Sequence, residues 1–262
     1  MTDPIYHDSA QYDAMYGDLV ADIPLLVGLM RSAGGPVLEV CCGNGRVLVP
    51  MRRAGVDVDG LDLSPEMLDG LRAKLAAEGL SAGTHLGDMR DFSLPRRYAR
   101  VLIAFNSLLH NLTQADQLAA LRRCRAHLAS GGRFVMVVFH PSVDGLVSWA
   151  AGEKLVKEVP NPNGAGRVRV RDHAVDDRVE QVRHVTRHID YLEPDGTLVR
   201  TETLVFAIRY AYKPELELLL RVAGFTHWTV QPLDLDPATN GWVPASRTPV
   251  EGDMLLWTAW SD

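Results

Sequence analysis

Apolar segments of strand length alternate with segments of helical periodicity between residues 36 and 139, and this alternation restricts the fold more than any other feature. The predicted strands cover residues 36–42, 56–63, 83–87, 99–105 and 133–139. Helices are predicted at 45–54, after Ser64 as N-cap with Pro65 in the first turn, and at 114–129. Strands joined by helices of this length are connected by crossovers and run parallel. The chain is therefore predicted to form a doubly wound α/β core.

The periodicity changes to a strict alternation of apolar and polar residues between about residues 150 and 212. Glu-Pro-Asp-Gly at 193–196 predicts a tight turn between two strands of this kind. Helical spacing returns at 213–223, and strand-like runs follow at 226–231 and 253–260. We therefore expect an antiparallel sheet inserted into the parallel core.

These patterns divide the chain into three parts. An N-terminal segment, residues 1–35, has helical spacing at 17–33. The core comprises residues 36–140 and 213–262. The antiparallel insertion, residues 141–212, separates the two parts of the core.

Charge and cysteine content exclude several classes of function. A net charge of −6 provides no general attraction to nucleic acid or to an anionic membrane, and no apolar run reaches the roughly 18–20 residues of a membrane span. The three cysteines (Cys41, Cys42 and Cys124) fit neither a disulfide framework nor a zinc site, and the nine histidines are not spaced as metal ligands. The N-terminal sequence is typical of neither a signal peptide nor a transit peptide. We expect a cytoplasmic protein without a metal.

The turn after the first predicted strand, residues 41–45, is the first indication of a ligand. Ligands of open parallel sheets bind beyond the carboxyl ends of the strands, and Gly43 and Gly45 allow the backbone of this turn to approach one. A dinucleotide turn requires a third glycine or alanine where this chain has Leu48. Glu39, just before the turn, would repel a pyrophosphate. The turn therefore favours a ligand with an ammonium or sulfonium group.

Polar residues also end the next strands. Asp62 ends the second, where an aspartate can accept hydrogen bonds from both hydroxyls of a ribose. Asp88 follows the third and is placed to accept from an exocyclic amine, and Phe105 and Asn106 end the fourth. Each acid alone is explained better by a helix cap or a solvated loop. Their occurrence at successive strand ends, together with the glycine turn, favours a nucleoside site.

Five segments together carry a resemblance to a known family. "VLEVCCGNGRVLVPMRRAGVDVDGLDLSPEML" (37–68) resembles the first two motifs of class I S-adenosylmethionine-dependent methyltransferases, and "GDMRDF", "FNSLLHNL" and "LASGGRFVMVVFHP" resemble the motifs that follow. "YAYKPELELLLRVAGF" is similar to a late element of the same family. Among its members, the chain looks most like small-molecule enzymes of the aminosugar N-methyltransferase type. The combination of these segments is specific for the family, although no single segment is.

The resemblance implies a Rossmann-like, seven-stranded, mostly parallel sheet with helices on both faces, an antiparallel last strand and S-adenosyl-L-methionine bound at the strand ends. It assigns the methionyl part of the cofactor to Glu39 and the turn, the ribose to Asp62, and the adenine to the residues around Asp88. The implied cofactor-binding residues are Tyr16, Glu39, Cys41, Gly43, Asn44, Gly45, Asp62, Leu63, Met67, Asp88, Met89, Phe105 and Asn106. One departure concerns Cys41, because the family usually has glycine there.

A methyl acceptor must be aligned with the cofactor and, if it is acidic, must lose a proton. His110 follows the fourth strand, where an imidazole can accept a proton near neutral pH. His140 follows the fifth strand, and Tyr16 shares a helical face with Tyr12 on the N-terminal segment, which the resemblance implies is a lid over the cofactor. Packing, or a solvent-facing helix end, remains the alternative for each. His110, Tyr16 and His140 are the predicted catalytic residues.

Two roles of the insertion remain open. In similar small-molecule methyltransferases such a sheet walls the acceptor pocket or pairs subunits into a homodimer. The alternating Arg167, Arg169 and Arg171 suit either an anionic acceptor or, more simply, a solvated strand face.

Three functions remain from the sequence. The first is transfer of a methyl group to nitrogen or oxygen of a small molecule, in particular a secondary metabolite. The second is a protein that binds the cofactor without catalysis and acts through its insertion. The third, a nucleic-acid methyltransferase, is disfavoured by the acidic charge and by Phe-Asn-Ser-Leu at 105–108 in place of the tetrad that handles a flipped adenine. We expect no nucleic-acid or membrane partner.

Overall fold

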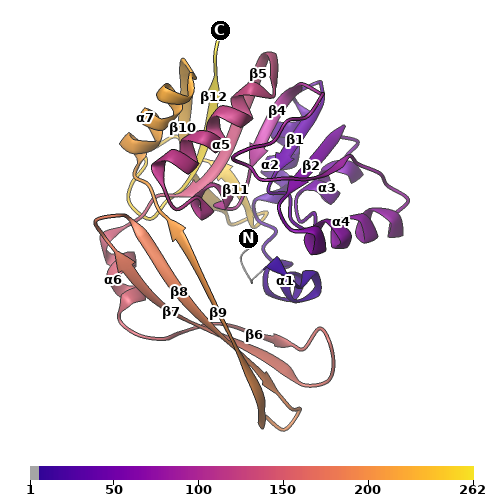
Figure 1. Cartoon of the computed structure of the whole chain (residues 1–262), viewed down its shortest axis with the longest axis vertical. Coiled ribbons are helices and arrows are strands. Elements are labelled where there is room, and N and C mark those ends of the chain that lie inside the picture. Colours follow the sequence, from indigo (N-terminus) through magenta and orange to yellow (C-terminus); the bar gives the residue numbers. More distant parts are fainter. Residues whose placement is uncertain (1–5) are drawn as a thin grey trace.

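The computed structural model describes residues 6–262, which form two separate sheets (Figure 1). The strands of the larger sheet are β1 (Val37–Val40), β2 (Val58–Asp62), β3 (Thr84–Leu86), β4 (Tyr98–Ile103), β5 (Leu128–Phe139), β10 (His227–Asp236), β11 (Gly241–Pro244) and β12 (Met254–Trp260). Their order is β11-β10-β12-β5-β4-β1-β2-β3. Strands β1 to β5 pair in parallel through crossover connections. The doubly wound core expected from the alternation is confirmed.

The larger sheet has eight strands, one more than the seven expected. The last strand, β12, is antiparallel to β5, as the family resemblance implies. The additional strand is β11, which pairs with the end of β10 from Leu233↔Pro244 to Asp236↔Gly241. Its four residues, Gly-Trp-Val-Pro, are too few to show an alternation in the sequence.

Helices cover both faces of the larger sheet. The helices α2 (Ile23–Arg31), α3 (Leu48–Arg53) and α4 (Pro65–Ala77) share one apolar cluster, and α5 (Gln114–Ala126) and α7 (Lys213–Ala223) share the other. Strand β1 contributes Val37 to the first cluster and Leu38 to the second, because successive side chains of a strand point to opposite faces. No helix among residues 6–262 has the length and apolarity needed to cross a membrane.

Several helix boundaries differ from the expectations. The helix expected at 17–33 is shorter, since a turn occupies its first residues and α2 begins at Ile23; the helix α1 (Ser9–Tyr16) precedes that turn. Helix α3 begins at Leu48 instead of 45, because the preceding turn includes Gly45 with a φ of +88°, outside the helical range. Helix α6 (Val143–Ala150) and the 3-10 helix η2 (Ser107–His110) are additional. By contrast, Ser64 caps α4 as expected and accepts a hydrogen bond from the Met67 amide.

The smaller sheet is the antiparallel insertion, with β6 (Lys154–Pro160), β7 (Arg167–Asp177), β8 (Val182–Leu192) and β9 (Leu198–Arg209) in that order. The turn predicted at 193–196 joins β8 to β9. Along β7, Val168 and Val170 are buried, whereas Arg167, Arg169 and Arg171 alternate with them. Because these three arginines pair with acidic side chains of neighbouring strands and loops, they form a charged strand face.

A buried arginine holds the insertion on the core. Arg209, at the end of β9, pairs with Glu215 of α7 at 2.6 Å and donates to the side chains of Gln117 on α5 and Gln181 before β8. Only 5% of Arg209 is exposed. Since a buried guanidinium needs partners for its donors, this network fixes β9 against both helices.

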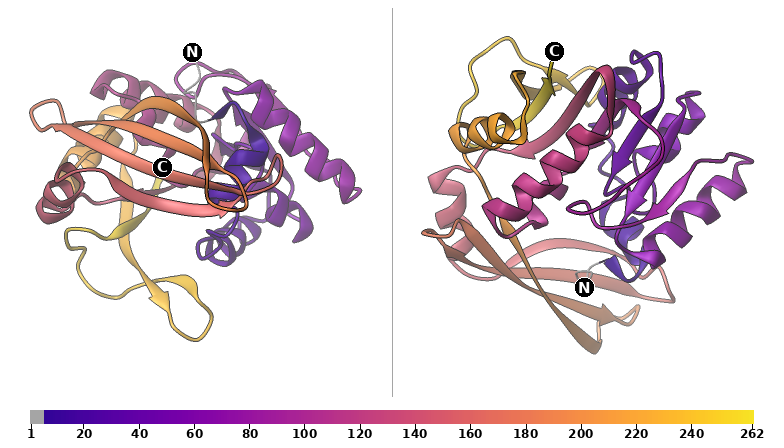
Figure 2. Two further views of the ribbon diagram at one scale, coloured as in Figure 1. Left: turned by 90° about the horizontal axis from the view of Figure 1, so that it is seen from below. Right: turned by 45° about the horizontal axis from the view of Figure 1, so that its top comes forward.

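Helix α1 lies between the core and the insertion (Figures 1 and 2). On the core side, the fully buried Asn44 donates to the Ser9 oxygens and to Asp13. On the insertion side, Lys157 of β6 donates to the Met15 carbonyl, and Gln11 donates to Tyr191 of β8. Polar contacts to the core and to the insertion therefore determine the position of α1.

Candidate active site

The turn after β1 is held by the end of β2. The Gly43 amide donates to Asp62 Oδ2 at 2.7 Å, and the Ser64 amide donates to Asp62 Oδ1 at 2.9 Å. Gly45 packs so closely on α4 that an added Cβ would lie 2.5 Å from Leu71 Cδ1. Glycine is therefore required at this position both by backbone conformation and by packing.

Cys41 adopts a left-handed backbone conformation with φ of +61°. The side chain is half-buried, packs against the apolar cluster beneath α5 and lies with Sγ 3.8 Å from Met89 Sδ. Burial raises the pKa of its thiol, which leaves it protonated at neutral pH. The left-handed φ explains why glycine is usual here, and the protonated thiol argues against a nucleophilic role.

Replacing Cys41 with valine should lower the free energy of unfolding by about 1–3 kcal/mol, because a β-branched residue is strongly disfavoured at positive φ. Replacing it with glycine should change the same quantity by less than about 1 kcal/mol, since relief of backbone strain offsets the lost packing. Urea unfolding of both variants, with Cys41→Ala as the matched control, measures this difference. Equal stability of the valine and glycine variants would contradict a role for backbone strain.

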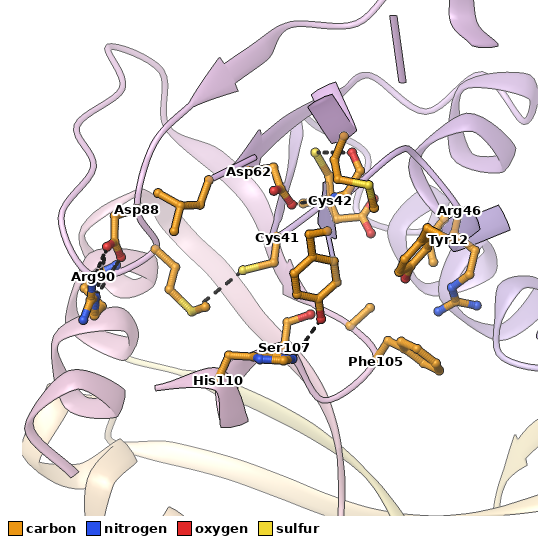
Figure 3. A pocket seen from close by; sticks show the side chains of 18 of the residues that line it. Tyr12, Cys41, Cys42, Arg46, Asp62, Asp88, Arg90, Phe105, Ser107 and His110 are labelled. Atoms are coloured by element: carbon orange, nitrogen blue, oxygen red, sulfur yellow. Dashed lines mark hydrogen bonds and ion pairs between the residues drawn. The ribbon is translucent and has the colours of Figure 1, made fainter. Parts of the chain in front are cut away.

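A cavity of about 360 Å³ lies beyond the carboxyl ends of β1, β2 and β4 (Figure 3). This volume is within the ~300–1,000 Å³ typical of sites for small molecules and cofactors. Ten residues predicted from the sequence line it: Glu39, Cys41, Gly43, Asp62, Leu63, Met67, Asp88, Met89, Phe105 and His110. The predicted edge of the sheet is therefore where the cavity forms.

Glu39 places a buried carboxyl group in this cavity. Only 3% of the residue is exposed, and its Oε2 atom has no hydrogen-bond partner within the described part of the chain. Burial raises the pKa of Glu39 to about 8, against an opposing effect of the nearby Arg46 charge. A buried carboxylate oxygen without a partner is rare in proteins and here fits a ligand that brings a cationic donor.

Arg46 places a positive charge in the same cavity, and the sequence interpretation missed it. Its guanidinium pairs with Asp22 at 2.6 Å, donates to the Leu19 carbonyl and lies 4.5 Å from the ring centre of Phe105. The glycine turn Gly43-Asn44-Gly45 immediately precedes this arginine, which is the only signal the sequence offers. Because Asp22 already binds this guanidinium through two hydrogen bonds, Arg46 fixes the turn to the segment that precedes α2.

Asp62 and Asp88 differ in their surroundings. Burial raises the pKa of Asp62, opposed by the amide hydrogen bonds from Ser64 and Gly43. Asp88 forms an ion pair with Arg90 at 2.6 Å, and this contact lowers its pKa. Arg90 also lines the cavity and was not predicted. Figure 3 shows Asp88 and Arg90 on one side of the cavity and Arg46 on the other.

A second cavity of about 240 Å³ adjoins the first, on the side of the insertion. The two cavities share four lining residues, Tyr6, Tyr12, Phe105 and His110. The remainder of the second cavity is formed by Tyr16, by Trp149 of α6 and by side chains of β7, β8 and β9. The four shared residues therefore mark the place where two ligands can meet.

His110 lies at this junction. Its Nε2 atom is 2.9 Å from the Tyr6 hydroxyl, and the two rings contact edge to face. The preceding Phe105 and Asn106 both have left-handed backbone conformations, with φ of +51° and +65°. Consecutive left-handed residues are uncommon outside functional sites, and here they redirect the chain from β4 into η2, which carries His110.

Five predicted residues do not line the first cavity. Tyr16 lines only the second, where its hydroxyl accepts a hydrogen bond from Arg187 at 2.8 Å. Asn44 holds α1, Gly45 packs on α4, and Asn106 Oδ1 accepts from the Phe139 amide.

His140 also lines neither cavity, and its catalytic role stays a prediction. Its backbone pairs with Asp253 and Gly252, and its ring contacts Tyr212 at 5.9 Å between centres. The chain turns into α6 directly after β5, so His140 is directed toward the β12 side of the sheet.

Comparisons with known proteins agree with this geometry. Residues 37–132 match the family model of the methyltransferase domain. The chain is 30% identical over 232 residues to the dTDP-3-amino-3,4,6-trideoxy-alpha-D-glucopyranose N,N-dimethyltransferase of Streptomyces venezuelae, which covers 86% of this chain and 89% of that protein. It is 38% identical over 116 residues to the dTDP-3-amino-3,6-dideoxy-alpha-D-glucopyranose N,N-dimethyltransferase of Streptomyces fradiae, a match that spans only 44% of each.

A solved structure is similar over nearly the whole chain. The CcbJ methyltransferase of Streptomyces caelestis has a TM-score of 0.67 and 26% identity, with 95% of this chain and 98% of that chain covered. The similarity therefore includes the insertion as well as the core.

Proposed function

This chain belongs to the S-adenosylmethionine-dependent methyltransferases, and we propose that it transfers methyl groups to the amine nitrogen of an amino sugar in a secondary metabolite. Transfer to a small molecule is the activity of the family members it matches. The choice of nitrogen and of an amino sugar rests on the printed names of the two Streptomyces relatives. The single observation that carries the proposal is the junction of two cavities at His110.

The first cavity is the proposed cofactor site. When bound there, S-adenosylmethionine supplies a methyl group activated by its sulfonium sulfur. Glu39 would bind the ammonium of its methionyl part, and Asp62 would accept from the ribose hydroxyls. Leu63 and Met67 would line the adenine, with Asp88 and the Met89 backbone at its polar edge. The unpaired Glu39 oxygen and the cavity volume support this assignment.

The second cavity is the proposed acceptor site. Tyr6, Tyr12 and Phe105 would exclude water from the junction, which matters because the reacting groups must be held in line. His110 Nε2 would accept the proton that the amine loses, either directly or through the Tyr6 hydroxyl to which it is hydrogen-bonded. Tyr16, which lies next to Tyr12 in the lining, would help to position the acceptor.

Cofactor binding at pH 7 should release about one proton per complex, and the Glu39→Gln variant should release almost none. With its pKa near 8, the Glu39 carboxyl is mostly protonated in the free protein, and a bound ammonium favours its ionised form. Affinity should therefore rise as pH increases toward 8 and fall as the solution is acidified. Calorimetry in two buffers of different ionisation enthalpy counts the protons.

The control for this experiment is Glu78→Gln, because Glu78 is exposed on the far end of α4 and pairs with Arg53. It should release protons as the unmodified protein does. Undiminished proton release by Glu39→Gln would assign the proton to another group.

A screen for turnover tests the proposed function. Amino sugars, other amines, phenols and carboxylates are supplied with S-adenosylmethionine, and adenosylhomocysteine release is measured. We expect release with amino sugars and little with phenols or carboxylates. Cofactor binding without release in any class would instead support the non-catalytic alternative. The cytoplasmic location, the homodimer and the lid role of residues 1–35 stay predictions.

A further inference from the structure

The charged side chains of the acceptor cavity are already paired with one another. Arg187 of β8 donates to both oxygens of Asp172 on β7, at 2.8 and 2.7 Å, and also to the Tyr16 hydroxyl. Arg183 likewise donates one hydrogen bond to each carboxylate oxygen of Asp176, at 2.8 and 3.0 Å. These are the two arginines that line the cavity within the described residues.

Burial makes these pairs hard to replace. The side chains of Asp172 and Arg187 are 6% and 8% exposed, and those of Asp176 and Arg183 are 2% and 11% exposed. An incoming phosphate would have to displace a carboxylate that is held by the same sheet, and the displaced carboxylate would remain buried without a partner. The cavity is therefore poorly suited to a phosphate or pyrophosphate.

A continuous row of rings faces the same cavity. From Phe105 the row runs through Tyr16, Tyr12 and Tyr6 to His110, with successive ring centres 5.8, 4.9, 6.1 and 5.5 Å apart. The faces of such rings attract alkylammonium cations. The row begins and ends on residues shared with the cofactor cavity, so it surrounds the position where an amine would meet the cofactor.

A further part of the lining is apolar. It includes Trp149, Val185, Phe206 and Ile208. The volume of about 240 Å³ is below the ~300–1,000 Å³ typical of pockets for drug-sized ligands. The cavity thus offers space for one ring-sized group that carries an amine, with apolar contacts from α6, β8 and β9.

We infer that the acceptor is an amine carried on an uncharged, partly apolar scaffold, such as an amino sugar already joined to its aglycone, and not a nucleoside-diphosphate sugar. This inference rests on the proposed function. It separates this chain from the two Streptomyces relatives, whose names specify dTDP-linked amino sugars. The internally paired arginines disfavour a diphosphate in this cavity, and the row of rings favours the ammonium.

Binding to the protein saturated with adenosylhomocysteine tests the inference with three probes. Choline is a small alkylammonium cation, 3,3-dimethyl-1-butanol is its neutral isostere, and dTDP carries the nucleoside diphosphate. Choline should bind on the order of tenfold more tightly than the alcohol, as measured by calorimetry. The inference predicts that dTDP does not bind saturably at millimolar concentration.

A gain of anion binding gives a second test. Asp172→Asn should release the Arg187 guanidinium, so dTDP affinity should increase by about tenfold or more. Asp190→Asn is the matched control. Asp190 accepts two hydrogen bonds from Arg171 on the same pair of strands, but neither residue lines the cavity. This control should leave dTDP affinity unchanged. If Asp172→Asn does not fold, the three probes on the unmodified protein decide the question.

The outcomes separate this inference from the proposed function. Tight binding of dTDP by the unmodified protein, or faster turnover of a dTDP-linked amino sugar than of its glycoside, would overturn the inference and leave amine methylation intact. Equal binding of choline and its isostere would also contradict it. Failure of every amine to be methylated by a protein that binds adenosylhomocysteine would overturn the proposed function itself.

Discussion

Replacing His110 with alanine should lower the turnover number by at least about 100-fold and leave the affinity for adenosylhomocysteine nearly unchanged. A general base typically contributes about 10²- to 10⁴-fold, and His110 lines both cavities at their junction. Steady-state kinetics over a range of pH, with calorimetry for adenosylhomocysteine, measures both.

Two further variants sharpen this prediction. Tyr6→Phe removes the hydroxyl that lies 2.9 Å from Nε2, and it should lower turnover less than His110→Ala because the imidazole remains. His173→Ala is the matched control, since His173 is exposed on β7, and its turnover should be unchanged.

Other results for His110→Ala have distinct meanings. A packing role would reduce stability and cofactor affinity together, whereas a positioning role would raise the Michaelis constant of the acceptor and leave the pH profile unchanged. Near-full turnover would contradict the assignment. It would indicate that the proton is accepted by water or by Tyr16, which lines the same acceptor cavity.

Replacing Asp62 with alanine should weaken binding of adenosylmethionine and adenosylhomocysteine by tenfold or more. Hydrogen bonds to a charged group contribute roughly 1.5–3 kcal/mol each, and the carboxylate is expected to accept from the ribose hydroxyls. The variant also removes the acceptor of the Gly43 and Ser64 amides, so the turn that approaches the cofactor loses its support. Calorimetry with adenosylhomocysteine gives the change directly.

The control for this prediction is Asp69→Ala, whose side chain is 74% exposed on α4 and pairs with Arg72. Its cofactor affinity should equal that of the unmodified protein. The cofactor affinity of Asp62→Asn should lie between those of Asp62→Ala and the unmodified protein, because an amide oxygen can replace only one of the two acceptor oxygens. Unchanged affinity of a folded Asp62→Ala protein would show that this aspartate serves the turn alone and would refute the ribose assignment.

Local signals in the sequence were sufficient for most of the architecture. The change of period from 3.6 to 2 marked the insertion, the turn at 193–196 joined β8 to β9, and Ser64 with Pro65 marked the start of α4. Each of these signals is carried by residues that are close together in the sequence. Elements of few residues, such as β11 and η2, were missed because a period cannot be established over four positions.

The cofactor edge of the sheet could also be predicted, because parallel strands end at one edge and their terminal residues must meet there. Glu39, Asp62 and Asp88 were found in this way and all line the first cavity. Asn106 and His140 line neither cavity, for a related reason. Adjacency to a strand end does not determine where a side chain points once the backbone takes a left-handed turn or leads directly into a helix.

The sequence by itself determined the order of the elements, the two periodicities and the residues at the ends of the parallel strands. Only the tertiary structure decided the acceptor cavity, where Tyr16 meets Arg187 and Tyr6 meets His110. These partners are far apart along the chain. The first pair joins α1 to the insertion, and the second joins the segment before α1 to η2. The pairing of Arg187 with Asp172 depends on strand register, which places the two residues opposite each other on β8 and β7. Register is set by packing across the whole sheet, so the charge balance of the cavity emerges only when the sheet is assembled.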